Sequence, residues 1–78
     1  MGALKPGTRA INDQIGSNIA RARKRAGLTQ YRLGERASIR QADISRLERG
    51  HYSPHLATLV RLAGALEMPV TDLLDGIG

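Results

Sequence analysis

Residues 29–50 read TQYRLGERASIRQADISRLERG and contain two short helical patterns joined by a turn. Each pattern is shorter than the roughly 12–15 residues that an isolated helix needs to be stable in water. The two helices are therefore expected to form only if they pack against each other. The apolar residues that supply the packing face are Leu33, Ala37, Ile39, Ile44 and Leu47.

The second helix of this stretch, expected at residues 39–49, leaves a polar face outward. Glutamine pairs bidentately with adenine, arginine pairs with guanine, and alanine contacts the thymine methyl group. This composition indicates a helix-turn-helix whose second helix enters a DNA major groove. Gly34 is a small residue where the two helices would cross. The outward residues are Arg40, Gln41, Ala42, Asp43, Ser45, Arg46 and Arg49.

Length and composition favour one small all-helical domain. A chain of 78 residues is near the size at which a single core barely suffices. The absence of cysteine excludes disulfides and thiolate metal sites. Ten Leu, six Ile and two Val, with two Tyr as the only aromatic residues, favour helix packing over a β-sandwich. The sequence has no apolar run near the roughly 20 residues of a membrane span and no signal-peptide stretch, so we expect a soluble protein.

Charge is unevenly distributed along the chain. Residues 1–50 hold eleven basic and four acidic side chains, whereas residues 51–78 hold one basic and three acidic ones. This asymmetry suggests that one face meets a polyanion. A basic surface that is merely solvated explains the charge equally well. The helix-turn-helix pattern of residues 29–50 must therefore decide between a polyanion-binding face and a solvated one.

Capping and periodicity divide the chain into a flexible arm, residues 1–10, and a domain, residues 11–78. A first helix is expected from Asn12 or Asp13, either of which can cap it, to residue 26, with Gly27 as its stop. Thr29 should cap the second helix, which ends near residue 37. The third is expected to end near Arg49.

The remaining sequence predicts two more helices. Ser53 and Pro54 form a cap residue followed by a proline at the first helical position. A short fifth helix is expected over residues 70–75 after the break at residues 68–69. The buried stripe of the fourth helix is expected to consist of Leu56, Leu59, Leu62, Ala63 and Leu66.

Residues 15–74 resemble the phage repressor/Cro type of helix-turn-helix domain, also called the XRE family. The matching segments are IGSNIARARKRAGLTQYRLGERA, ISRLERG and SPHLATLVRLAGALEMPVTDLL. The resemblance implies a compact five-helix bundle of the lambda-repressor-like type. It also implies a transcriptional regulator, expected to be a repressor, that binds a near-palindromic operator in double-stranded DNA as a homodimer. Such a protein, bacterial or phage in origin, would act in the cytoplasm of a bacterium.

The resemblance also implies roles for individual residues. Gln30 would contact phosphate, and Arg23 would form a structural ion pair with Glu48. Base contacts are expected from Arg40, Gln41, Ala42, Ser45 and Arg46. Further candidates for phosphate contacts are Tyr31, Arg49 and Tyr52. Apolar residues in excess of what a terminal helix needs predict a dimer interface at Leu66, Val70, Leu73, Leu74 and Ile77.

Two positions depart from the family pattern. Ser38 stands where the turn usually has glycine, and it carries a steric cost if φ there is positive. Arg40 replaces the usual Ser or Thr cap of the third helix and has no acceptor to cap with. Asp43 can compensate in part at this helix N-terminus.

Other classes of function remain open at this point. An antitoxin or a restriction–modification controller would use the same DNA-binding mechanism, and a protein-interaction module could use the same bundle without DNA. An enzyme is disfavoured because we find no nucleophile–base pair, paired carboxylates or phosphate-cradling loop. His51 and His55 are read as exposed loop residues, so no metal or cofactor is expected.

Overall fold

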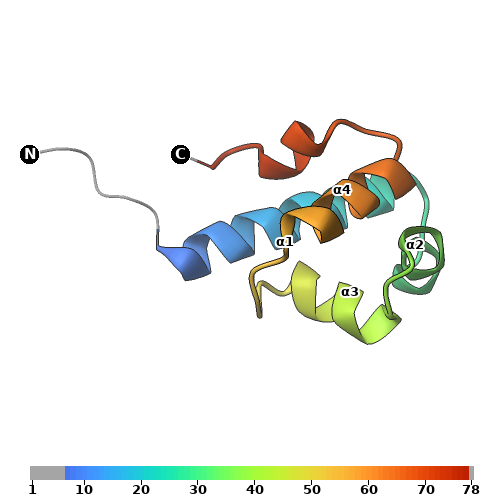
Figure 1. The fold of residues 1–78 in the computed structure, drawn as a ribbon, viewed down its shortest axis with the longest axis horizontal. Helices are drawn as coiled ribbons and strands as arrows, with labels where there is room; N and C mark the ends of the chain where they lie inside the picture. The colour runs from blue at the N-terminus through green and yellow to red at the C-terminus, as the bar shows by residue number, and fades with distance from the viewer. Residues whose placement is uncertain (1–6, 78) are drawn as a thin grey trace, which may run out of the picture.

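The computed structural model describes residues 7–77, which form four α-helices and one 3-10 helix (Figure 1). The elements are α1 (Thr8–Arg25), α2 (Gln30–Ala37), α3 (Gln41–Glu48), α4 (Leu56–Ala65) and η1 (Val70–Leu74). Within residues 7–77 there is no strand, which confirms the all-α prediction. None of the helices in this part of the chain is both long and apolar enough to cross a membrane.

The last element corrects the expectation of five α-helices. In η1 the Asp72 amide donates to the carbonyl of Pro69, three residues earlier in the chain, at 3.0 Å. That spacing is the mark of a 3-10 helix, which proteins use in short pieces. The segment follows Pro69 and is only five residues long, so it is too short to develop regular α-helical bonding.

The first helix begins at Thr8, four or five residues before the expected start at Asn12 or Asp13. Its N-cap is Gly7, whose carbonyl accepts from the Ile11 amide at 3.0 Å. Residues 8–10 are therefore helical and do not belong to a flexible arm; the remainder of the expected arm, residues 1–6, lies outside the described residues. Asn12 is not a cap, because its side chain is buried and accepts a hydrogen bond from the Ser53 hydroxyl at 2.9 Å. The helix stops as predicted, with Gly27 at φ 74°.

The fourth helix begins later than expected, at Leu56, with His55 as its N-cap. Ser53 lies two residues before this N-cap, and its hydroxyl instead donates to Asn12. The prediction that Leu56 belongs to the buried stripe is wrong: its side chain is 69% exposed. The stripe instead consists of the buried residues Leu59, Leu62 and Ala63, with half-buried Leu66 at its end.

One hydrophobic core joins all five elements. Its helix-turn-helix members are the predicted Leu33, Ala37, Ile44 and Leu47, while Ile39 is half-buried at the edge. The other core residues are Ile15, Ile19, Leu59, Leu62, Ala63 and Leu73. In Figure 1, α3 and η1 lie on opposite sides of α1 and α4. The face carrying α3 is therefore separated from the C-terminal segment.

A buried amide holds η1 against α1. The Asn18 side chain is 4% exposed and donates to the carbonyls of Leu73, at 3.0 Å, and Asp75, at 2.8 Å. Its oxygen accepts from the Gln14 amide at 3.0 Å. Because Asn18 satisfies carbonyls that the short η1 element leaves open, it fixes the position of the C-terminal segment.

Candidate nucleic-acid interface

The turn between α2 and α3 requires a very close approach of the two helices. A side chain at Gly34 would collide with Ile39, because its Cβ would lie closer to the Ile39 carbonyl oxygen than van der Waals radii allow. The chain reverses through Ser38, which has φ 58° and ψ 46°, the left-handed conformation that glycine normally supplies. The predicted small residue at the crossing and the predicted strain at Ser38 are both present. Together they set the angle at which α3 leaves α2.

The other end of α3 is set by a second glycine, which the sequence reasoning did not single out. A Cβ at Gly16 of α1 would collide with the Leu47 carbonyl and would lie 2.7 Å from the Glu48 carbonyl. The backbones of α1 and α3 therefore touch at this point. A glycine inside the first helical pattern was the available signal, since a helix-interior glycine costs stability unless packing requires it.

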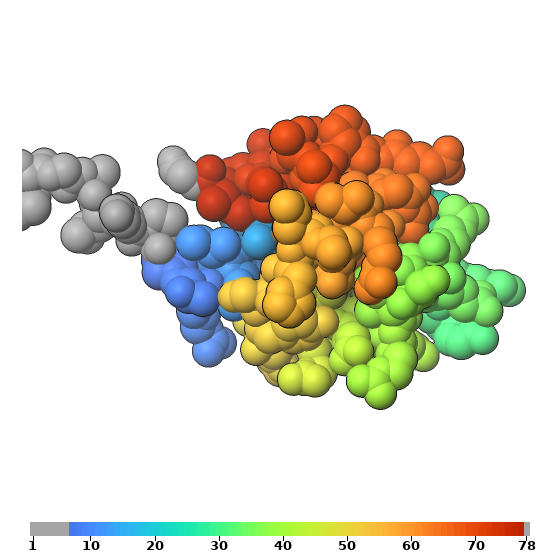
Figure 2. Space-filling view, in the orientation of Figure 1, coloured from blue at the N-terminus to red at the C-terminus, as the bar shows by residue number. Residues whose placement is uncertain are grey.

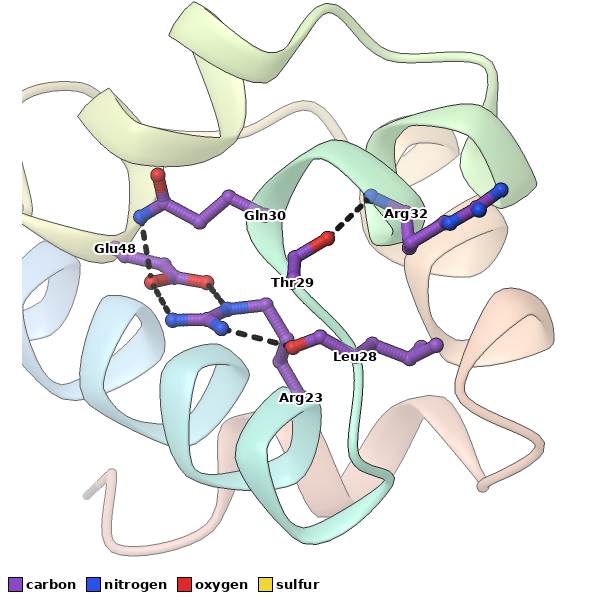
Figure 3. A network of polar contacts seen from close by, with 6 residues as sticks. All are labelled: Arg23, Leu28, Thr29, Gln30, Arg32 and Glu48. Atoms are coloured by element: carbon purple, nitrogen blue, oxygen red, sulfur yellow. Dashed lines mark hydrogen bonds and ion pairs between the residues drawn. The ribbon is translucent and has the colours of Figure 1, made fainter.

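A buried ion pair ties α1, α2 and α3 together (Figure 3). Arg23 donates from Nε to Glu48 Oε2 at 2.6 Å and from Nη2 to Oε1 at 3.0 Å. A third bond runs from Arg23 Nη1 to the Leu28 carbonyl at 2.9 Å. The two side chains are 12% and 7% exposed. Hydrogen bonding to Glu48 raises the pKa of Arg23 above its ordinary value, against the lowering effect of burial.

The same carboxylate orients Gln30, the first residue of α2. The Gln30 amide nitrogen donates to Glu48 Oε1 at 3.0 Å, and its oxygen points away from the ion pair in Figure 3. Thr29 caps α2 as predicted by accepting from the Arg32 amide at 3.0 Å. The start of α2 is thus held in place by a side-chain cap and by a link to α3.

The polar side chains of α3 lie opposite its buried residues Ile44 and Leu47. Segments from residue 30 to 52, green to yellow in Figure 2, make up the lower part of the surface in that view. Arg40 occupies the N-cap position of α3, but its side chain makes no capping hydrogen bond, as predicted. The exposed residues are Arg40, Gln41, Ala42, Arg46 and Arg49, and Ser45 is half-buried between them.

Arg46 makes two contacts on this surface. Its guanidinium carbon lies 5.4 Å from the centre of the Tyr52 ring, and its Nη1 lies 3.8 Å from Asp43 Oδ1. The Tyr52 hydroxyl donates to the main-chain oxygen of Asp43 at 3.5 Å. Burial raises the pKa of Tyr52, the Asp43 charge adds to this rise, and the Arg46 charge opposes it. Tyr31, by contrast, is 55% exposed at the start of α2.

The residues predicted to form a dimer interface do not share one environment. Leu73 is fully buried in the core of its own chain, so its assignment to an interface is wrong. Leu74 is 38% exposed. Leu66, Val70 and Ile77 are half-buried and pack against the core.

A second apolar surface lies on α4. Leu56 is 69% exposed and Val60 is 52% exposed. The sequence reasoning placed Leu56 inside and did not consider Val60. Their spacing of four residues, which puts both on one helical face, was the available signal.

Comparisons with known proteins agree on the nature of this fold. The helix-turn-helix family HTH_3 matches residues 19–73. An HTH-type transcriptional regulator from Sinorhizobium fredii is 42% identical over 60 residues, covering 77% of this chain and 78% of that protein. The immunity repressor protein of Bacillus phage phi105 is 37% identical over 60 residues, again 77% of this chain, but the match spans only 42% of the repressor.

A solved structure supports the same assignment. The P22 c2 repressor, determined in complex with a synthetic operator, superposes with a TM-score of 0.73 at 31% identity, covering 80% of this chain and 94% of that one. The family match covers more than half of the sequence and includes all of α2, α3 and α4. The chain therefore belongs to the HTH_3 helix-turn-helix family.

Proposed function

We propose that this chain is a sequence-specific DNA-binding transcriptional regulator that acts by occupying an operator. The main support is the exposed face of α3, where Gln41, Ala42 and Arg46 stand on a helix fixed from behind by the close contacts at Gly16 and Gly34. A rigid helix that presents Gln, Ala and Arg carries the side chains that read base edges in a major groove. Arg40 before these residues and Ser45 among them complete the reading set.

Phosphate contacts would come from the start of α2 and from the ends of α3. The Gln30 amide keeps one hydrogen for a phosphate after donating to Glu48. The α2 N-terminus adds peptide amides, Tyr31 adds an exposed hydroxyl, and Arg49 adds a charge. Such contacts position the protein without reading sequence, and they make the affinity fall steeply with salt.

The proposed regulator binds as a homodimer. Two copies related by a twofold axis would set their α3 helices about one DNA turn apart, roughly 34 Å, on a near-palindromic site. After the correction at Leu73, the interface assigned to the C-terminal segment consists of Leu66, Val70, Leu74 and Ile77. The immunity repressor and the operator-bound phage repressor support a role as a repressor. A regulator of this kind acts where the DNA lies, which in a bacterium is the cytoplasm.

Oligomeric state can be measured directly. Leu74→Ser should shift the mass in solution toward the monomer, whereas Val60→Ser, on the exposed α4 face, should leave it unchanged. If Val60→Ser dissociates the dimer and Leu74→Ser does not, the interface lies on α4 instead.

Selection of bound sequences from a random pool of duplex DNA tests the proposed function. The expected result is enrichment of one site with two related half-sites, centred one helical turn apart. Failure to enrich any sequence, with a folded protein, would contradict the proposal and would favour a protein-interaction module built on the same bundle.

A further inference from the structure

Arg46 is held in place by two neighbours on the exposed face of α3. Asp43 lies 3.8 Å away across an ion pair, and the Tyr52 ring faces the guanidinium at 5.4 Å from its centre. The Tyr52 hydroxyl donates to the Asp43 main chain at 3.5 Å, which joins the two neighbours to each other. We call Asp43, Arg46 and Tyr52 the arginine clamp. It connects α3 with the loop that follows it.

The ion pair of the clamp adds little to folding. The Arg46 side chain is 54% exposed, and an ion pair in that environment contributes little stability because water and salt screen it. Its main effect is on the conformations of Arg46 itself. A long side chain that is already confined loses less freedom when it binds, so confinement favours the one geometry that matches a partner.

Asp43 also acts on DNA through its charge. Its carboxylate lies 3.4 Å from Arg40 Nε as well, so one acidic group sits between two arginines on the face assigned to DNA. A carboxylate there repels phosphate whatever the sequence, and thus lowers the affinity for every DNA. Specificity is a difference of affinities, and an unfavourable element that acts on all sequences can increase it when it also orients a base-reading group.

We propose that Asp43 and Tyr52 are specificity-determining positioning residues, which hold the Arg46 guanidinium for one base of the operator and do not themselves contact that base. The inference rests on the proposed function, in which Arg46 reads a base edge. The chemistry of a confined guanidinium fits the paired acceptors O6 and N7 of guanine.

Asp43→Asn tests the charge and the ion pair of the clamp. The DNA set is the site selected by the wild type, its single-base variants, and a duplex of random sequence. At the base whose preference Arg46→Ala removes, discrimination should fall about tenfold, on the order of a lost bidentate contact. Affinity for random DNA should instead rise several-fold. The plot of log affinity against log salt concentration should become steeper by a slope of about one. A substitution that acted only through folding would weaken binding to the selected site and to random DNA alike.

Glu35→Gln is the matched control for charge. Glu35 is an acidic residue on the neighbouring helix α2, and its partners are Arg32 and Tyr31, so the substitution changes net charge equally without touching the clamp. We expect a gain on random DNA and unchanged base preference.

Substitutions of Tyr52 separate the ring from its hydroxyl. Tyr52→Leu removes the ring and should reduce preference at the same base, with no gain on random DNA. Tyr52→Phe keeps the ring and should keep the preference. In the double variant Asp43→Asn/Arg46→Ala, preference at that base should equal that of Arg46→Ala alone, because Asp43 acts through Arg46.

The outcomes distinguish this inference from the proposed function. If the wild type selects a site but Asp43→Asn and Glu35→Gln behave alike, with base preference intact, the clamp has no role in specificity and the proposed function stands. The inference is also overturned if Arg46→Ala changes preference at no base. If the wild type selects no site, the proposed function falls and the inference falls with it.

Discussion

Removing Arg23 should destabilise the fold far more than removing an exposed arginine. Arg23→Met keeps the volume of the side chain stem but leaves the Glu48 carboxylate, 7% exposed, without its cation. Breaking a buried pair in this way costs about 3–5 kcal/mol. A domain of 78 residues has a total unfolding free energy of about 4–12 kcal/mol, so one substitution would remove a large part of it.

The chain offers a matched control in Arg32 and Glu35. Arg32 Nη1 lies 3.0 Å from Glu35 Oε1, but the side chains are 68% and 45% exposed. Arg32→Met should therefore cost less than about 1 kcal/mol. The difference between the two variants measures what the buried, bidentate pair contributes beyond an exposed ion pair within one helix.

The double variant Arg23→Met/Glu48→Leu completes the test. Replacing both members of a buried pair with apolar residues of similar size is often neutral or stabilising, so stability should return to within about 1 kcal/mol of the wild type. Urea unfolding followed by circular dichroism measures all four proteins. The reasoning is refuted if Arg23→Met costs no more than Arg32→Met, or if the double variant is no more stable than Arg23→Met.

Three further predictions concern packing, polar contacts and pH. Gly34→Ala should reduce the unfolding free energy by about 1–3 kcal/mol, because the new Cβ must push the Ile39 carbonyl away; an unchanged urea midpoint would contradict this. Asn18→Ala should cost about 1–3 kcal/mol and loosen η1, since the Leu73 and Asp75 carbonyls lose their donor; hydrogen exchange should rise in residues 70–77, while Ser17→Ala on the exposed neighbour changes nothing. In a Tyr31→Phe background, ultraviolet titration of the folded protein should place the pKa of Tyr52 above its ordinary value of about 10. Because the folded pKa is the higher one, the contribution of Tyr52 to stability is constant below pH about 10 and is lost as pH rises through the folded pKa; Tyr52→Phe should remove this contribution.

The helix-turn-helix could be predicted because its signals are local. Thr29 caps α2, Gly34 lies at the crossing, and the apolar spacing of α3 puts Ile44 and Leu47 inside. Each of these effects depends on residues within a few positions of one another. The outward face of α3 follows from the same spacing.

The two residues expected to start α1 and α4 share one long-range contact. Asn12 and Ser53 are good N-cap residues by composition, but they bond to each other across 41 positions of the sequence. Neither side chain caps a helix: Asn12 lies inside α1, whose N-cap is Gly7, and α4 begins after its N-cap His55. Local propensity could not reveal this contact, because it depends on how α1 packs beside the loop that precedes α4.

The sequence named candidate DNA-contacting residues but not the contacts between them. Gln30 and Arg46 were expected to act as independent contacts. The structure links Gln30 to Glu48 and Arg46 to Asp43 and Tyr52. The Gln30–Glu48 and Arg46–Tyr52 contacts join different elements or cross a glycine turn, and no spacing in the sequence encodes them. The Arg46–Asp43 pair is an i,i+3 contact within α3, which the helical spacing could have indicated. Leu73 was misassigned for a similar reason, since an apolar residue in a short terminal helix can face inward or outward.

The central claim is that α3 reads the base sequence, whereas the start of α2 contacts phosphate. One measurement tests this claim most directly. Affinities of Arg46→Ala and Gln30→Ala are measured for the selected site, for each of its single-base variants and for random duplex DNA. We predict that Arg46→Ala flattens the preference at one base in each half-site, with a smaller loss on random DNA. Gln30→Ala should weaken binding to every sequence by the same factor. Equal losses on the selected site and on random DNA for Arg46→Ala would contradict the claim that α3 reads the sequence.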